Sequence, residues 1–117
     1  MGLKEKRKGE YGERCLRNLL RETLGDLIDE EDIKRGSVFQ KTSDVIGLPE
    51  IHVECKFVEK LNIHAAMKQA VEESKKRKDG MPTVFFRRSR EDTLVCMRYE
   101  DWAKLYRAYL NRLPFED

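Results

Sequence analysis

Two carboxylates and a lysine stand at positions that would bring them together on one face of a predicted sheet. The run Ile51–Phe57 alternates apolar and polar side chains, which predicts a strand with Glu54 and Lys56 side by side on its polar face. Asp44 lies ten residues before Glu54, at the end of a short preceding strand. Two carboxylates from neighbouring strands form an oxygen site of the kind that Mg²⁺ or Mn²⁺ prefers, and a nearby lysine can orient or deprotonate an attacking water. A strand with one solvated face shows the same alternation, so an ordinary exposed strand is the alternative.

A further carboxylate lies on the apolar side of a predicted N-terminal helix. Apolar residues recur at three- and four-residue steps over residues 10–24, which predicts one amphipathic helix. At about 100° per residue, Glu13 projects between Leu20 and Leu24. Because an uncompensated buried charge is costly, we expect Glu13 to meet Lys56, an arginine or a second metal ion. The alternative is a glutamate at the wet edge of the stripe that reaches solvent.

The charges are unevenly distributed along the chain. The net charge is +2, from 24 basic and 22 acidic residues, but segment 26–32 holds five acidic residues and no Lys or Arg. The rest of the chain is therefore more basic than the total suggests, which favours either a surface for a polyanion such as nucleic acid or an ordinary mixed surface. The candidate phosphate contacts are Lys75, Lys76, Arg77, Lys78, Arg87, Arg88 and Arg90. A solvated helix end explains the lysine run equally well. His52, on the polar face of its strand, is another candidate, with a structural role as its alternative.

Helices and strands in the order α-β-β-β-α-β-β-α would position these residues. The periodicity predicts helices at 10–24, at 63–74 with a stop at Gly80, and around 102–110, and strands at 37–40, 42–47, 51–57, 82–86 and 93–97. We expect the first two strands to form a hairpin-like pair and the acidic segment 26–32 to form a loop or a helical turn. Trp102, Tyr106 and Tyr109 share one stripe of the last helix, a pattern more typical of a core or a dimer interface than of a base-stacking surface.

Length and composition favour a single α/β domain over residues 1–117. Charged and hydrophobic residues each make up 39%, and ten aromatic residues argue against disorder. The three cysteines include no CxxC pair, so neither a disulfide framework nor a zinc ribbon is expected. No apolar segment follows the basic start, and no run of eighteen apolar residues occurs, so we expect a cytoplasmic protein in which residues 1–8 form a mobile basic arm.

Taken together, four motifs resemble the PD-(D/E)XK nuclease superfamily, and most closely its archaeal and phage Holliday junction resolvase-like branch. They are Lys8-Gly9 with Glu13 in a first helix, Ser43-Asp44-Val45-Ile46, Ile51-His52-Val53-Glu54-Cys55-Lys56, and a following helix that carries Gln69. The resemblance covers roughly residues 8 to 86. It implies a restriction-endonuclease-like fold with a central mixed sheet flanked by helices. Two departures are that Ser43 replaces the motif's proline and that Gln69 lies outside the apolar stripe of its helix.

The resemblance also implies roles for individual residues. Asp44 and Glu54 would bind the metal together with the backbone carbonyl of Cys55, and Lys56 would be the catalytic lysine. Glu13 would be the helix carboxylate near the metal. Gln69 would be a supporting polar residue, for which a solvated helix position is the alternative.

From this resemblance we expect a Mg²⁺- or Mn²⁺-dependent endodeoxyribonuclease that cleaves branched DNA, works as a homodimer and leaves a 5′-phosphate. A bacterial, archaeal or phage-infected cell is the expected setting. Substrate choice depends on loops and dimer geometry, so a nicking, restriction-like or end-processing nuclease of the same superfamily remains open. A DNA-binding module without catalysis on the same fold is the alternative from a different class.

Overall fold

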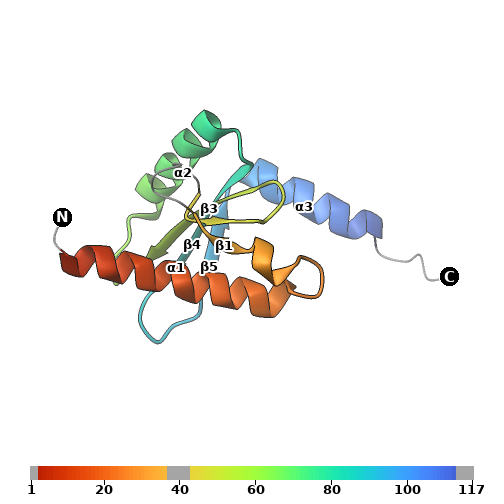
Figure 1. The fold of residues 1–117 in the computed structure, drawn as a ribbon. Coiled ribbons are helices and arrows are strands. Elements are labelled where there is room, and N and C mark those ends of the chain that lie inside the picture. Colours follow the sequence, from red (N-terminus) through yellow and green to blue (C-terminus); the bar gives the residue numbers. More distant parts are fainter. Residues whose placement is uncertain (1–2, 37–42, 113–117) are drawn as a thin grey trace.

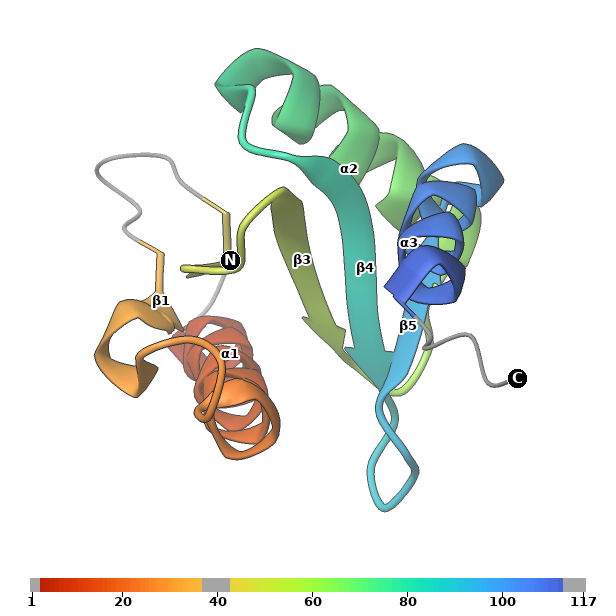
Figure 2. The same cartoon turned by 90° about the vertical axis from the view of Figure 1, so that its right-hand side faces the viewer.

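A computed structural model describes residues 3–36 and 43–112 and has a mixed α/β fold, as the sequence predicts (Figure 1). Its elements are α1 (Leu3–Leu24), the short 3₁₀ helix η1 (Glu30–Asp32), β1 (Lys34–Arg35), β2 (Val45–Ile46), β3 (Ile51–Phe57), α2 (Ile63–Arg77), β4 (Met81–Arg87), β5 (Leu94–Met97) and α3 (Tyr99–Arg112). Helices α1 and α2 lie on opposite sides of the sheet, and α3 projects from the body (Figures 1 and 2). No helix within the described ranges is long and apolar enough to cross a membrane.

The main sheet has three strands in the order β3-β4-β5. β3 and β4 are parallel, with Glu54 opposite Val84, and α2 is the crossover between them. β4 and β5 pair antiparallel. Because β3 is an edge of this sheet, its free side is available to the segment that leads into β2. The amide of Asp44 donates to the carbonyl of Val53 across that edge at 3.0 Å.

Two apolar clusters hold the helices on the sheet. On one face, Leu16 and Leu20 of α1 pack with Ile33, Val45 and Val53. On the other face, Ala66 and Ala70 of α2 pack with Val84. Since opposite residues in this parallel register share a face, Glu54 lies on the same side of the sheet as Val84, toward α2. The predicted alternation of apolar and polar residues in β3 therefore separates a face covered by α1 from a face covered by α2.

Local sequence signals explain where α1 ends and where α2 begins and ends. Gly25 ends α1, and its amide donates to the Arg21 carbonyl at 2.9 Å. The side chain of Asn62 caps the start of α2 by accepting from the Ala65 amide at 3.1 Å. Lys78 closes α2 in the left-handed conformation, two residues before the predicted stop at Gly80.

The N-terminal helix is longer than the periodicity predicts. It begins at Leu3 rather than near residue 10 and runs through Gly9. The physical reason is that residues 3–8 are Lys, Glu, Arg and Leu, whose high helix propensities offset about 1 kcal/mol for one interior glycine. Most of the segment expected to be a mobile arm is thus helical.

The first predicted strand, 37–40, lies outside the described residues. Within the described residues a different segment pairs with the second predicted strand: β1 lies antiparallel to β2, and Arg35 lies opposite Val45. The acidic segment contains the expected helical turn, η1. Side-chain capping by Asp29, which accepts from the Glu31 amide, explains why a turn forms there.

Candidate active site at the free edge of the sheet

The free edge of β3 brings Asp44 next to Glu54. The Asp44 carboxylate accepts a hydrogen bond from the amide of Cys55 at 2.7 Å, which fixes the side chain along the strand. The N–H and C=O of one strand residue point to the same edge, so the carbonyl of Cys55 also faces this side. Asp44 directly precedes β2 instead of ending a strand as predicted, and backbone geometry that the sequence spacing alone did not specify joins it to the motif residues of β3.

The ionised form of the Asp44 carboxyl is disfavoured in this position. Burial raises its pKa from 3.8 to about 7, and the negative charge of Glu54 adds to that rise. The hydrogen bond from Cys55 and the positive charge of Lys56 oppose the shift without cancelling it. A cation placed between the two carboxylates would relieve this conflict.

Glu54 is 7% exposed, and each of its carboxylate oxygens faces a basic nitrogen. Lys56 Nζ lies 3.6 Å from one oxygen, and His52 Nε2 lies 3.9 Å from the other. The strand geometry explains this row, because residues two apart share a face. Lys56 is partly exposed, so its ammonium group can reach a ligand at the edge of the sheet.

His52 is 2% exposed and is held by a residue that the motif analysis did not identify. Its Nδ1 lies 2.8 and 2.9 Å from the two oxygens of Asp79, which follows α2. Ser43 donates to Asp79 at 2.7 Å and lies 2.9 Å from the same Nδ1. Burial alone would lower the pKa of His52, but Glu54 and Asp79 raise it above its ordinary value. A ring buried this deeply does not reach a DNA phosphate, which favours the structural alternative for His52.

The sequence carried little signal for Asp79 and Ser43. Ser43 occupies the position of the motif's proline, and Asp79 belongs to the turn Lys78-Asp79-Gly80, which reads as ordinary helix-ending sequence. Only the crossover from β3 through α2 to β4 returns Asp79 to the start of β3. The weak signal in the sequence was the presence of an aspartate just after a helix together with a histidine in the preceding strand that had no assigned partner.

Glu13 approaches the same region from α1. Its carboxylate is half-buried and accepts from Arg35 Nε at 3.2 Å, so an arginine is the partner among those left open by the sequence. Burial raises the pKa of Glu13, while Arg35 opposes that shift and the charge of Glu54 adds to it. Neighbouring Gly12 allows this close approach, because an added Cβ would lie 2.9 Å from the Cβ of Phe57.

The fold does not place Gln69 beside Asp44, Glu54 and Lys56. It is exposed on α2, and within the described ranges it has no hydrogen bond or ion pair to the site residues. The apolar side of α2, with Ala66 and Ala70, faces the sheet instead. This placement agrees with the solvated alternative for Gln69.

The candidate phosphate contacts divide into exposed side chains and side chains that already contact another residue. Lys75, Lys76 and Lys78 are exposed at the end of α2, whereas Arg77 binds Glu73 at 2.9 Å. Arg90 is also exposed. Arg87 lies over the ring of Phe57 at 5.5 Å from its centre. Arg88 pairs with Glu91 at 2.8 Å in the turn after β4.

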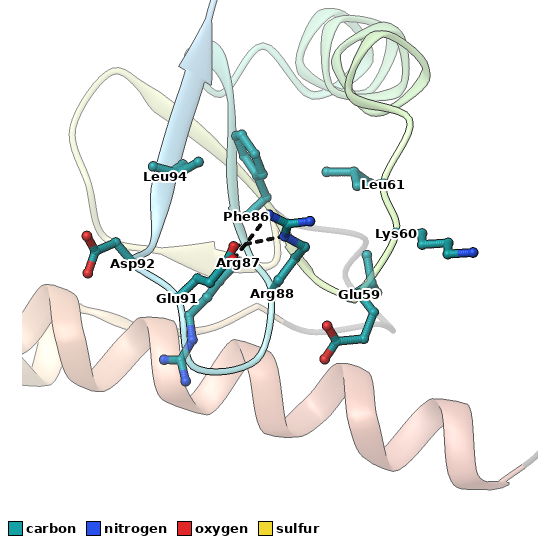
Figure 3. Close-up of a pocket in the computed structure, with 10 residues that line it drawn as sticks. Glu59, Lys60, Leu61, Phe86, Arg87, Arg88, Glu91, Asp92 and Leu94 are labelled. Carbon is teal, nitrogen blue, oxygen red and sulfur yellow. Dashed lines mark hydrogen bonds and ion pairs between the residues drawn. The ribbon is translucent and has the colours of Figure 1, made fainter.

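A pocket of about 430 Å³ lies at that turn (Figure 3). Arg88 and Glu91 form the ion pair drawn there, and Glu59, Lys60 and Asp92 add charges of both signs to the lining. Asp44, Glu54 and Lys56 are not among its lining residues. The pocket is thus separate from the carboxylate pair, and its mixed charge does not by itself define an anion site.

The donor set at the β3 edge fits a hard divalent cation. In the part of the chain that is described, no three His, Cys, Asp or Glu side chains are grouped as a complete metal site. Mg²⁺ commonly binds through one or two carboxylates and takes its other ligands from water and substrate phosphate. Asp44, Glu54 and the Cys55 carbonyl match that partial set, and burial together with the charge of Glu54 raises the pKa of Asp44.

One comparison with known proteins identifies a family for the chain. The family model described as "Phage putative PDDEXK endonuclease" matches residues 4–116. No curated protein and no solved structure matches the chain. The match extends beyond the motifs to include β5 and α3, for which the sequence offered no counterpart. PD-(D/E)XK nucleases generally use divalent metals and act on DNA. The chain therefore belongs to the phage putative PDDEXK endonuclease family, a family of the PD-(D/E)XK nuclease superfamily.

Proposed function

We propose that this nuclease is a Mg²⁺- or Mn²⁺-dependent endodeoxyribonuclease whose active site is the free edge of β3. The observation that carries the proposal is the meeting of Asp44 with Glu54, with Lys56 Nζ 3.6 Å from the Glu54 carboxylate. Asp44, Glu54 and the carbonyl of Cys55 would hold the cation. Bound there, it would neutralise the scissile phosphate and lower the pKa of an attacking water.

The side chains then have separate tasks. Lys56 orients the water and offers positive charge to the phosphate oxygens as negative charge develops on them. Glu54 holds Lys56 in place through their ion pair. Glu13 adds a negative charge close enough to interact with Glu54, and its ion pair with Arg35 offsets part of that charge. Water attacks the phosphorus in line as the P–O3′ bond breaks, so the products carry a 5′-phosphate and a 3′-hydroxyl.

We propose branched DNA as the substrate class. The motifs resemble the Holliday junction resolvase-like branch, and the exposed lysines at the end of α2 offer sequence-independent contacts to phosphate. Lys75, Lys76 and Lys78 are free of ion pairs within the described structure, so counterion release on DNA binding is available to them.

The experiment is cleavage of a labelled four-way junction and a matched linear duplex in Mg²⁺ or Mn²⁺, with EDTA and Lys56→Ala as controls. Paired symmetrical cuts in the junction alone are expected. Equal cutting of both substrates would indicate a broader nuclease and contradict the branched-DNA proposal. Tight binding without metal-dependent cutting would contradict the catalytic proposal and favour a DNA-binding module.

A homodimer is the second part of the proposal, with α3 as the contact surface. Apolar side chains on this helix are exposed: Tyr99, Trp102, Leu105, Tyr106, Tyr109 and Leu110. Trp102 and Tyr106 stack with ring centres 5.2 Å apart. Exposed apolar groups of this extent mark contact surfaces. An antiparallel pair of α3 helices would set Glu100 near the basic end of its partner, which makes a second copy a complementary occupant.

Sedimentation equilibrium would test this contact. Wild-type protein is expected to be dimeric, and Leu105→Asp is expected to be monomeric because it places a charge in the apolar contact. Leu27→Asp is the matched control, since Leu27 is 81% exposed outside α3. A wild-type monomer, or a Leu105→Asp dimer as stable as the control, would overturn the proposed contact.

A further inference from the structure

Three separate segments meet in one buried polar network behind Glu54. Ser43 precedes β2, His52 belongs to β3, and Asp79 lies between α2 and β4. Ser43 and His52 are both buried, and all three side chains contact one another at 2.7–2.9 Å. Buried networks of this kind fix side-chain orientation when their members are hydrogen-bonded. One ring atom is the exception.

That exception is His52 Nε2, which is buried and has no hydrogen-bond partner among the residues that the structure describes. Because an ionised carboxylate only accepts hydrogen bonds, Asp79 requires Nδ1 to be the donor and sets the ring orientation. Nε2 then points to Glu54, with 3.9 Å to its carboxylate oxygen. The unsatisfied atom therefore faces the carboxylate of the proposed metal ligand, at a distance longer than a hydrogen bond.

The backbone around Asp79 is fixed tightly enough to transmit this orientation. Lys78 caps α2 in the left-handed conformation, and Gly80 has φ of +133°. A Cβ on Gly80 would lie 2.4 Å from the carbonyl carbon of Glu50, so the chain passes directly against the residue before β3. The Met81 amide also donates to the Glu50 carbonyl at 2.7 Å.

We propose that Asp79 and Ser43 are positioning residues that act through His52 to hold the Glu54 carboxylate for metal binding. This inference rests on the proposed function, since it assigns Glu54 to the metal. Residues that orient a metal ligand from behind commonly change metal affinity 10- to 100-fold when they are mutated. In the described part of the chain Asp79 hydrogen-bonds His52 and Ser43 and neither Glu54 nor Lys56, so its effect on Glu54 passes through the His52 ring.

The test is calorimetric titration of the full chain with Mn²⁺ in the absence of DNA. Asp79→Ala should weaken Mn²⁺ binding by about 10- to 100-fold. Glu73→Ala is the matched control because Glu73 also carries an ion pair near the end of α2 and is 31% exposed, against 29% for Asp79. The control should bind Mn²⁺ as the wild type does. Asp79→Glu, which keeps the carboxylate, should recover part of the loss.

Cleavage supplies a second readout that a purely structural role would not give. Excess Mn²⁺ should restore the turnover of Asp79→Ala toward the wild-type value while KM for DNA is unchanged. If Asp79→Ala does not fold, Ser43→Ala replaces it, with a smaller loss of Mn²⁺ affinity expected. Wild-type affinity in a folded variant would overturn the positioning role. Absence of Mn²⁺ binding and of cleavage in the wild type would instead overturn the proposed function.

Discussion

Polar side chains are buried at the free edge of β3, whereas apolar side chains are exposed on the helix α3. At the β3 edge, His52 and Glu54 are polar and buried, whereas on α3 large apolar residues such as Leu105 and Tyr106 are exposed. Polar groups are usually buried only with partners, and apolar helix faces are usually covered. Each region therefore suits a partner: the first holds two neighbouring carboxylates that a cation would stabilise, and the second presents apolar side chains that a packing surface would cover.

The two regions differ in what removal of one side chain should do. Glu54→Ala should lower cleavage by about 10³-fold or more, because it removes a metal ligand and the partner of Lys56. Glu72→Ala, an exposed position on α2, should leave cleavage unchanged. Rates under single-turnover conditions and circular dichroism would show whether activity is lost without loss of fold. Unchanged turnover in Glu54→Ala would remove Glu54 from the site.

A pair of leucines compares packing in the body with packing on α3. Leu16 is 1% exposed and Leu105 is 44% exposed. We expect Leu16→Ala to lower the free energy of unfolding by about 2–5 kcal/mol, through lost burial and a cavity. In dilute, monomeric protein Leu105→Ala should change it by about 0.5 kcal/mol or less. Urea denaturation measures both, and similar losses would mean that α3 is packed on its own chain.

The buried Asp44 carboxyl at the β3 edge should make the stability of the fold depend on pH. Folding raises the pKa of Asp44 from 3.8 to about 7, so between these values the folded state binds more protons than the unfolded state. Stability in EDTA should therefore fall as pH rises from about 4 to 7, by up to about 1 kcal/mol per pH unit. Asp44→Asn should flatten this fall. An equally steep fall in the variant would assign the dependence to other groups.

The lysines at the end of α2 extend the comparison to substrate binding. Replacing Lys75, Lys76 and Lys78 by Gln should lower the slope of log K against log salt by up to about three and weaken DNA binding about 100-fold at 0.15 M salt. Cleavage at saturating DNA should persist because the carboxylates are untouched. Fluorescence anisotropy across a salt series would measure the slope. An unchanged slope would place these lysines away from DNA.

Two glycines of α1 give the smallest effects. Gly9→Ala should stabilise the fold by about 1 kcal/mol through helix propensity, since an added Cβ meets nothing within 4 Å. Gly12→Ala gains the same propensity but presses on Phe57, an overpacking that costs about 1–3 kcal/mol. The net change at Gly12 should therefore be neutral to destabilising. Thermal denaturation would compare the two, and equal stabilisation would contradict the close approach of α1 to β3.

Periodicity determined much of the fold because each pattern is local. The alternation in Ile51–Phe57 predicted β3, and the stripe from Ile63 predicted α2. The start of α1 was predicted wrongly, because Gly9 is a local break signal whereas helix propensity adds up over the whole segment. The exposure of α3 was not fixed by its stripe, since the same pattern is typical of a core helix and of an interface helix.

The sequence by itself determined which groups the candidate site would contain: Asp44, Glu54 and Lys56, with Glu13 on a helix. Local strand geometry places Glu54 and Lys56 on one face of β3, whereas the approach of Asp44 depends on a tertiary contact, the hydrogen bond from its amide to the Val53 carbonyl. Tertiary structure alone decided that Arg35 is the partner of Glu13, that Gln69 faces solvent, and that Asp79 reaches His52. The reason is that these outcomes depend on the crossover of α2 and the docking of α1, which place residues far apart in sequence within a few ångströms of one another.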